Sequence, residues 1–350
     1  MLQLTNKEKE DLLHLACENS QISLIKTLLK CNVNTNSINA KGLSPLHVAA
    51  INGNVEVTRL LVNEGANLEM KDSKCGSSPF LHACQNGRVK IVRLLIANGA
   101  NIKAVGMNGT NALHFAAESG NVELVEMLID NFPNVNATDA DGTTVLQFAA
   151  ISGNVKVLDI LIGRGADLNA QNRLNFDALH FAARYGNVQA TIYLIKKGCD
   201  IYSRNCHNNT FLQEVFCSQF AKIDENGRIA IIEALLNTGA DVNSFELHSE
   251  CYGRVPLLTY AIIDRNMEDL STILILNGAD INIKLPFFMP SFSMFFLAVL
   301  WKSYPISKAI LDVHPHFKDN RNLNLAESSL DMNIEKNGAL KVLLNHYHHY

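Results

Sequence analysis

The chain has 350 residues, of which 47% are hydrophobic and 18% are charged. Its 30 basic and 34 acidic side chains leave a net charge of −4, so no overall positive charge indicates binding to nucleic acid or to an anionic membrane surface. A single compact domain of this length would be unusual, whereas an array of repeats has no such limit on its length.

The first segment, Met1–Asp11, is charged and polar, and we therefore expect no secretory signal there. Eight cysteines are scattered along the chain without a C-x-x-C pair. Cys17 and Cys84 lie among small apolar residues. These thiols are typical of the reduced core of an intracellular protein.

Glycine recurs at a nearly fixed spacing through the first 200 residues. Gly53, Gly87, Gly120, Gly153 and Gly186 are separated by 34, 33, 33 and 33 residues. A second series, Gly65, Gly99, Gly165 and Gly198, follows the first. A period near 33 predicts an array of short helical repeats, each with two helices ended by glycine.

One repeat, Asn39–Lys71, shows the expected local structure. Ser44-Pro45 predicts the start of a helix, because the hydroxyl can cap free N–H groups and proline suits the first helical position. Gly53 ends this helix, and the apolar spacing of Val55–Leu61 predicts a second helix that ends at Gly65.

The same short sequence motifs recur along the chain. Asn-Ala-Leu-His-Phe-Ala-Ala covers residues 111–117, Asp-Ala-Leu-His-Phe-Ala-Ala covers 177–183, and Gly-Ala-Asp-Leu-Asn-Ala covers 165–170. These runs resemble the ankyrin-repeat family, with its T-P-L-H-x-A-A run and its G-A-D-x-N turn. The resemblance implies an all-α solenoid of helix–turn–helix repeats joined by β-hairpin loops.

When the motifs of this chain are aligned with those of the family, we expect residues 1–283 to form the repeat array and residues 284–350 to form a degenerate repeat or C-terminal cap. The first repeat has Ser20 at the first glycine position, as expected of an N-terminal cap. The expected repeats cover residues 7–38, 39–71, 72–105, 106–138, 139–171, 172–204, 205–244 and 245–283.

Several positions depart from the pattern. Phe132-Pro133 replaces the second Gly-Ala, and because a bulky residue at positive φ would be strained, we expect an altered turn there. Cys75 is the extra residue of the one 34-residue step. Surplus residues are expected between helices at Cys217–Gly227 and in a longer hairpin near Glu246–Gly253. Such insertions either extend a binding surface or reflect drift in a decaying repeat.

The uncharged segment Leu285–Trp301 has 17 residues, the lower limit for a membrane helix. Pro286 and Pro290 break its first half. We therefore expect a buried helix of a degenerate repeat rather than a membrane span.

No set of residues predicts catalysis or a cofactor. His47, His114 and His180 share one repeat position, about one repeat apart rather than around one point. Gln147 fills the same position, so we expect hydrogen bonding there rather than metal binding. We find no phosphate-binding glycine loop and no nucleophile elbow. The C-terminal His346–Tyr350 tract could bind metal weakly, but a flexible surface tail is the favoured interpretation.

The asparagines of the G-A-D-x-N turn raise one further hypothesis from the resemblance. Asn136, Asn169, Asn243 and Asn282 match the position that an asparaginyl hydroxylase can modify in animal ankyrin proteins. The alternative is that each asparagine bonds its own turn backbone.

The resemblance implies a protein-binding face formed by the hairpin tips and the exposed side of each first helix. Arg, Tyr and Phe are enriched at binding hot spots, which favours the sixth repeat, although Phe176 and Tyr185 could instead pack onto neighbouring hairpins. The candidate residues are Leu43, Ile51, Lys74, Met107, Glu118, Asp141, Ile151, Arg173, Leu174, Phe176, Arg184 and Tyr185.

We therefore expect a non-enzymatic protein–protein interaction scaffold, cytoplasmic and monomeric, without cofactor, metal or membrane partner. One alternative is an adaptor or microbial effector, active in a host cytosol, whose C-terminal segment recruits a second protein. Another is an enzyme with an ankyrin docking arm. That enzyme would need an active site within 284–350, a short segment for a catalytic domain.

Overall fold

A computed structural model describes residues 4–132, 134–217, 223–249, 253–263, 267–282, Ala298 and 303–313. The chain divides into two compact units, Met1–Ala182 and Ala183–Tyr350, and each is described by itself. This division differs from the expected boundary between residues 283 and 284, which stays a prediction.

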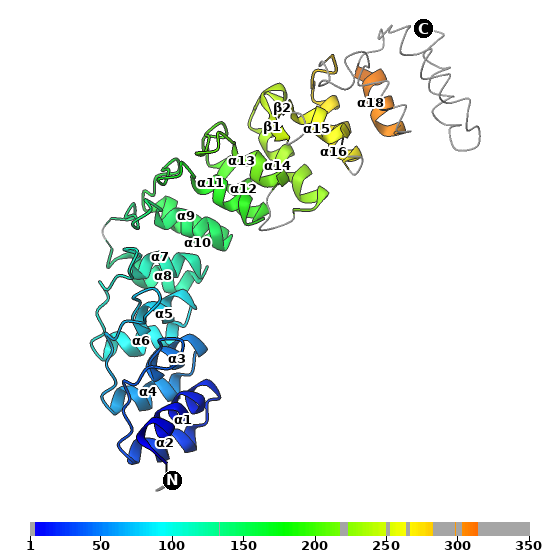
Figure 1. The fold of residues 1–350 in the computed structure, drawn as a ribbon. Helices are drawn as coiled ribbons and strands as arrows, with labels where there is room; N and C mark the ends of the chain where they lie inside the picture. Colours follow the sequence, from blue (N-terminus) through cyan, green and yellow to red (C-terminus); the bar gives the residue numbers. More distant parts are fainter. Residues whose placement is uncertain are drawn as a thin grey trace, which may run out of the picture. The chain divides into compact units, whose positions relative to one another are not determined.

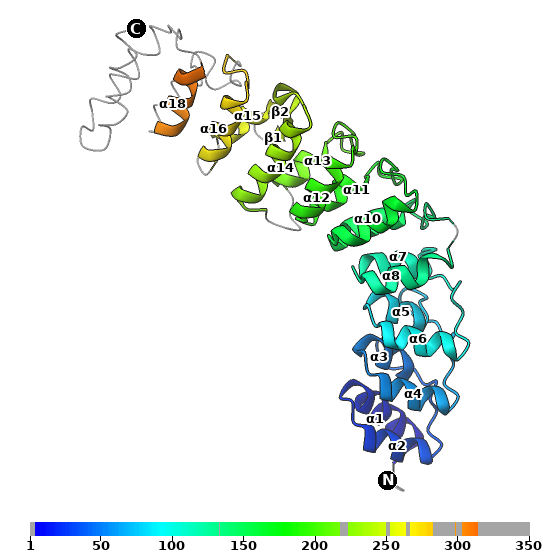
Figure 2. The same cartoon turned by 180° about the vertical axis from the view of Figure 1, so that it is seen from behind.

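The first unit is a stack of helix pairs, with the connecting hairpins on one side of the helices (Figure 1). Figure 2 shows the same succession of pairs from behind. The pairs are α1 (Asn6–Glu18) with α2 (Ile22–Lys30), α3 (Pro45–Asn52) with α4 (Val55–Asn63), α5 (Pro79–Gln85) with α6 (Val89–Ala97), α7 (Ala112–Glu118) with α8 (Val122–Ile129), and α9 (Val145–Ser152) with α10 (Val155–Gly163). The helix α11 (Ala178–Arg184) crosses the boundary between the two units.

The helix starts follow from the sequence. Ser44 caps α3 by accepting a hydrogen bond from the His47 N–H, and Pro45 occupies the first turn. Thr144 caps α9 in the same way through the Gln147 N–H. A side-chain oxygen thus satisfies one of the N–H groups that a helix start leaves open, and the predicted cap at Ser44 is confirmed.

The ends of the first helices require left-handed backbone. Gly53 ends α3 with a φ of 82°, a conformation that costs glycine little. Ser20 takes the corresponding place after α1 with a φ of 57°. Phe132 is not among the described residues with positive φ, which agrees with the altered turn expected there.

The core of the first unit lies between successive helix pairs. Leu46, Ala49 and Ala50 of α3 and Val57 and Leu61 of α4 are fully buried. The helix α3 packs against α5, α5 against α7 and α7 against α9, and among the second helices α2 packs against α4, α4 against α6 and α8 against α10. The small alanines allow the close approach that this stacking needs. Each repeat therefore depends on its neighbours for burial.

Asparagines of the G-A-D-x-N turns bond to the next repeat rather than to their own turn alone. The Asn136 Nδ2 donates to the Gly165 carbonyl at 3.1 Å, and its Oδ1 accepts from the Asp167 N–H at 2.8 Å. In the second unit, Asn243 makes the same pair of bonds to Gly278 and Asp280. These bonds hold successive turns together; hydroxylation of the asparagines stays a prediction.

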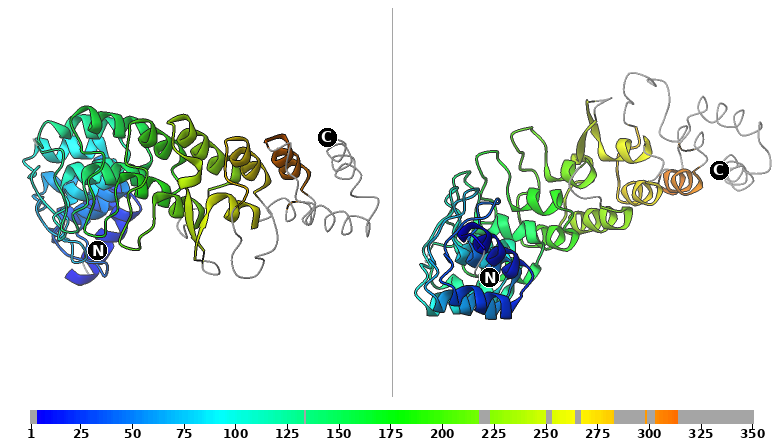
Figure 3. Two further views of the ribbon diagram at one scale, coloured as in Figure 1. Left: turned by 90° about the horizontal axis from the view of Figure 1, so that it is seen from above. Right: turned by 60° about the horizontal axis from the view of Figure 1, so that its bottom comes forward.

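The second unit is also built mainly of helices and contains one short β-hairpin (Figure 3). Its α12 (Val188–Lys196) packs against α14 (Glu225–Asn237), and its α16 (Glu268–Leu276) packs against α18 (Tyr304–Val313). The remaining elements are α13 (Phe211–Cys217), a 3-10 helix η1 (Val242–Ser244), β1 (Glu246–Ser249), β2 (Gly253–Pro256) and α15 (Leu257–Ile263).

Both expected insertions lie in this unit. Of the first surplus, predicted at Cys217–Gly227 between two helices, Glu225–Gly227 instead form the first turn of a lengthened α14, and residues 218–222 lie outside the described residues. The strands β1 and β2 pair antiparallel, from Glu246 opposite Pro256 to Ser249 opposite Gly253. The longer hairpin predicted near Glu246–Gly253 is therefore present.

The segment Leu285–Trp301 lies outside the described residues except for Ala298, which is buried. Among the described helices, none is both long and apolar enough to cross a bilayer.

Candidate functional site

Most hairpin turns of the first unit are closed by an Asn or Asp side chain at their first position, whereas the turn from Gly106 to Thr110 has a glycine there. The Asn39 Oδ1 accepts hydrogen bonds from the N–H groups of Lys41 and Leu43, at 2.9 and 3.1 Å. The Asp139 Oδ1 accepts from Asp141 and Thr143 in the same manner, at 2.9 and 2.8 Å. Such side-chain bonds fix a tight turn, so the residues at the tips project from a defined backbone.

Backbone hydrogen bonds connect each tip to the next. The Met107 N–H donates to the Cys75 carbonyl at 2.7 Å, the Ala140 N–H to the Asn108 carbonyl at 2.7 Å, and the Arg173 N–H to the Asp141 carbonyl at 2.9 Å. A weaker bond of 3.4 Å joins the Ser73 N–H to the Gly42 carbonyl. The tips of the second to sixth repeats thus form one connected ladder.

This ladder presents five of the sequence-predicted residues to solvent. Met107 is 70% exposed and Leu174 is 57% exposed, far more than a core role would give them. The charged side chains among the five are exposed as well, and they carry both signs. We call this set the hairpin-tip surface: Lys74, Met107, Asp141, Arg173 and Leu174.

The predicted residues at the ends of the first helices are less accessible. Ile51, Glu118 and Ile151 are half-buried. Burial raises the pKa of Glu118, and a hydrogen bond of 3.4 Å from the Gln85 Nε2 partly opposes that rise. These side chains therefore form a partly buried, largely apolar surface of the first unit rather than a series of fully exposed residues.

The prediction that Phe176 is exposed is wrong: it is 3% exposed. Its position in the turn corresponds to the buried Thr143 of the preceding hairpin, where the side chain faces inward because the adjacent backbone closes the turn. The Phe176 ring contacts those of His180 and Phe181 at centroid distances of 5.5 and 5.7 Å. Leu43 has the same position and is half-buried.

Arg184 and Tyr185 belong to the second unit and are therefore considered apart from the hairpin-tip surface. Tyr185 is 41% exposed, and Arg184 is half-buried. The sixth-repeat group expected from the sequence is thus divided: its three turn residues, Arg173, Leu174 and Phe176, lie in the first unit, and its two helix-end residues lie in the second.

The repeated histidines have the structural role that the sequence predicts. The His47 Nδ1 accepts from the Ser44 N–H at 3.1 Å, so Nε2 carries the proton and donates to the Ser77 carbonyl at 3.0 Å. Burial lowers the pKa of His47 to about 4. A neutral imidazole therefore joins a helix start to the next hairpin.

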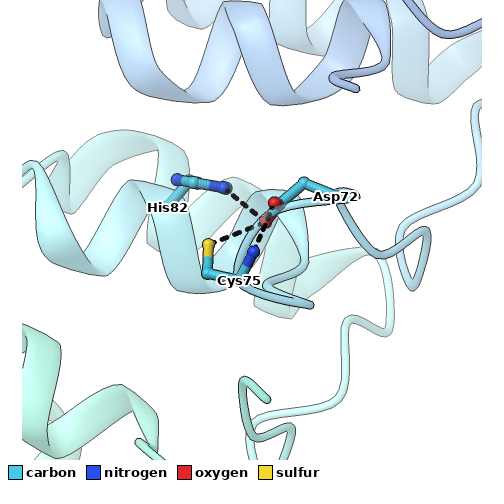
Figure 4. Close-up of side chains that lie close together, drawn as sticks. All are labelled: Asp72, Cys75 and His82. Carbon is cyan, nitrogen blue, oxygen red and sulfur yellow. Dashed lines mark hydrogen bonds and ion pairs between the residues drawn. The ribbon is translucent and has the colours of Figure 1, made fainter. Parts of the chain in front are cut away.

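A polar cluster in the third repeat was not singled out by the sequence. Figure 4 shows Cys75, from the hairpin, and His82, from α5, converging on the carboxylate of Asp72. The Cys75 Sγ and the His82 Nε2 each lie 3.0 Å from the Asp72 Oδ2. Asp72 and His82 are buried, whereas Cys75 is exposed.

Backbone groups hold the Asp72 carboxylate in place. It accepts from the N–H groups of Lys74, Cys75 and Ser77 at 2.7 to 2.9 Å. Burial opposes its charge, but these bonds together with those from the Cys75 thiol and His82 keep the pKa of Asp72 below its usual value. Burial and the neighbouring carboxylate raise the pKa of the Cys75 thiol.

Two sequence signals could have revealed this cluster. The inserted Cys75 was noted as a change in spacing, without a partner. In the third repeat the histidine is also displaced by one position, because Leu81 occupies the place of His47 and His82 follows it. Neither signal specifies by itself that both side chains meet at Asp72.

Comparison with known proteins gives a consistent picture. A family model described as ankyrin repeats (3 copies) matches residues 13–106, 67–139, 101–172 and 179–284. The putative ankyrin repeat protein FPV223 of Fowlpox virus (strain NVSL) is 46% identical over 50 residues, which are 14% of this chain and 36% of that protein. The match thus spans little more than a third of the viral relative.

The crystal structure of the human ASB11 ankyrin repeat domain is similar with a TM-score of 0.52 and 25% sequence identity. The likeness covers 63% of this chain and 96% of that domain. Ankyrin repeats generally mediate protein–protein interactions. Because the family model matches well over half of the residues, in register with the helix pairs, the chain belongs to the ankyrin-repeat family.

Proposed function

We propose that this protein is a non-enzymatic scaffold that binds a protein partner on the hairpin-tip surface of its first unit. The backbone ladder that joins the successive tips carries this proposal. It holds exposed apolar and charged side chains on a fixed framework, and a preorganised surface loses little conformational entropy on binding.

The chemistry of the surface favours a partner with an apolar patch and a mixed charged rim. Met107 is flexible and polarisable, which suits it to irregular apolar contacts. Lys74, Asp141 and Arg173 supply charges of both signs, and such charges set specificity and orientation more than affinity. The ladder spaces these side chains along the stack, so an extended segment or a helix of the partner fits this surface.

A pull-down from lysate with quantitative mass spectrometry tests the proposal, using the full chain and the double variant Met107→Asp/Leu174→Asp. The matched control is Leu276→Asp in the second unit, because Leu276 and Leu174 are both 57% exposed. We expect a specific partner to be lost from the double variant and kept by the control. Equal capture by all three proteins would place recognition elsewhere and contradict the proposal.

Other features of the proposal follow from the fold. We infer a reducing intracellular setting, because Cys17 and Cys84 are buried thiols without disulfide partners. We also propose a monomer, which light scattering of the purified chain checks.

The adaptor alternative depends on residues 284–350, of which the structure describes Ala298 and 303–313. Deleting the chain after Val313 tests it: an adaptor keeps its first partner and loses a second one. Loss of both partners, or of neither, would speak against that alternative.

A further inference from the structure

Two departures from the repeat pattern meet at one carboxylate in the third repeat. The inserted Cys75 lengthens the turn, so that the Asp72 N–H bonds to the Ser77 carbonyl five residues on, whereas the Asn39 and Asp139 turns close over four residues. The histidine displaced by one position, His82, leaves the capping role and bonds Asp72 instead. Both changes deliver a metal-ligand side chain to the same point.

The three side chains form a donor set of a familiar kind. A thiolate, an imidazole nitrogen and a carboxylate oxygen are all ligands of Zn²⁺, which prefers four ligands in a tetrahedron. The three ligand atoms lie within 4.8 Å of one another. Within the described part of the chain, this is the one group of three such side chains close enough to share a metal ion.

A buried hydroxyl beside the cluster provides independent support. Ser77 is 2% exposed, and its Oγ has no hydrogen-bond partner. Leaving a buried polar group unpaired is costly. Ser77 lies two residues from Cys75, and its own N–H donates to the Asp72 Oδ2 at 2.9 Å. A zinc-bound water at this cluster would supply the partner that the Ser77 hydroxyl lacks.

We propose that Asp72, Cys75 and His82 bind a zinc ion, with water as the fourth ligand. The ion replaces the two protons that now lie between these atoms. The Cys75 proton passes to solvent, and the Nε2 proton of the neutral His82 ring is exchanged through solvent for one on Nδ1, which leaves the Nε2 lone pair to bind zinc. Tetrahedral bonds to zinc place ligand atoms about 3.3–3.7 Å apart. The two 3.0 Å contacts therefore open slightly, while the remaining ligand–ligand distance shortens.

The surrounding structure suits such a site. Three backbone N–H groups keep bonding the Asp72 carboxylate and orient it, as outer partners of metal ligands commonly do. The exposed side of Cys75 gives the ion and its water access from solvent. Bound zinc would link the hairpin to α5 directly beneath the ladder, because the Cys75 carbonyl accepts from Met107.

Cobalt substitution tests the site in the full, reduced chain. Co²⁺ bound to a thiolate gives a ligand-to-metal charge-transfer band, and tetrahedral Co²⁺ gives intense visible bands. We expect one equivalent of Co²⁺ to produce both, and Zn²⁺ to abolish them by competition. The bands should disappear in Cys75→Ser, and affinity should fall by at least about tenfold in His82→Gln, which keeps the thiol.

The control is Cys31→Ser, which removes another exposed cysteine and should keep the bands. The C-terminal histidines are present in every variant, and binding to them gives no thiolate band. Circular dichroism establishes that each variant is folded. Addition of Zn²⁺ should raise the midpoint of thermal unfolding in the wild type and in Cys31→Ser, but not in the variants of the site. No thiolate band in the wild type, or an equal band in Cys75→Ser, would overturn the proposal.

Discussion

His47 and Gln147 occupy the same position in different repeats and make equivalent bonds. The Gln147 Oε1 accepts from the Thr144 N–H at 2.9 Å, and its Nε2 donates to the Ala170 and Phe176 carbonyls at 2.7 and 2.9 Å. His47 joins Ser44 and Ser77 in the same sense. In these two repeats the position thus supplies an acceptor and a donor on one side chain rather than an ionisable group.

His47→Gln should accordingly reduce the sensitivity of the fold to acid. The pKa of His47 is about 4 in the folded protein and 6.5 in a model peptide, so the unfolded chain binds more protons between those values. Stability from this group is present above about pH 6.5 and is lost as the pH falls toward 4. At pH 7.5 we expect the free energy of unfolding of His47→Gln to lie within about 1 kcal/mol of the wild-type value.

At pH 4 the variant should lose less stability than the wild type, by on the order of 3 kcal/mol. Urea denaturation at a series of pH values measures this difference. Parallel pH profiles for the two proteins would show that His47 is not the group responsible.

Ser20→Gly should stabilise the first repeat. Ser20 has a φ of 57°, and left-handed backbone costs a residue with a Cβ roughly 1–2 kcal/mol. Glycine removes that strain but has a more flexible unfolded state, so we expect a net gain of about 0.5–1 kcal/mol. Asn32→Gly is the control, since Asn32 has a φ of 53° and asparagine tolerates this conformation. A rise in the denaturation midpoint that is no larger for Ser20→Gly than for Asn32→Gly would contradict the argument.

At the scale of elements, side chains of the same hairpin turn differ in what they contact. The side chain of Asp139 closes its turn from inside, whereas that of Asp141 points from the tip into solvent. Two residues of the same type, two positions apart, thus have different surroundings because one faces the turn and the other faces solvent.

Asp139→Ala should destabilise the array by about 1–3 kcal/mol, because the Thr143 N–H loses its acceptor at a buried position. Asp141→Ala should change stability by less than about 0.5 kcal/mol, yet weaken binding of the proposed partner. Chemical denaturation and a binding titration of both variants check this. Equal destabilisation by the two substitutions would refute the distinction.

At the scale of the whole molecule, packing is between neighbouring helix pairs. Leu128 of α8 is fully buried in the first unit, and the contacts of α8 are with α7 and α10. A stack of this kind has a stability that is approximately the sum of repeat and interface contributions, so a core defect should remain local.

Leu128→Ala should therefore cost about 2–5 kcal/mol of local stability. Hydrogen exchange should show faster opening in α7 to α10, with protection in α14 and α16 of the second unit nearly unchanged. A uniform loss of protection along the chain would indicate one cooperative domain and contradict the prediction.

Much of the fold was determined by local features of the sequence. Ser44-Pro45 and Gly53 bound α3 as predicted, because capping and left-handed backbone are properties of a few adjacent residues. The repeated spacing predicted the stacking, since each helix pair has an apolar face that a neighbour must cover. The extra residues between α13 and α14 and in the β1–β2 hairpin were likewise visible as changes in spacing.

Only the tertiary structure decided which side chains face solvent and which meet inside. Phe176 lies in a turn that the sequence marks as exposed, yet the closed backbone directs its ring inward onto His180. Cys75 and His82 belong to different elements, and their meeting at Asp72 depends on how the lengthened turn lies against α5. Such contacts depend on the relative placement of elements, which local spacing does not specify.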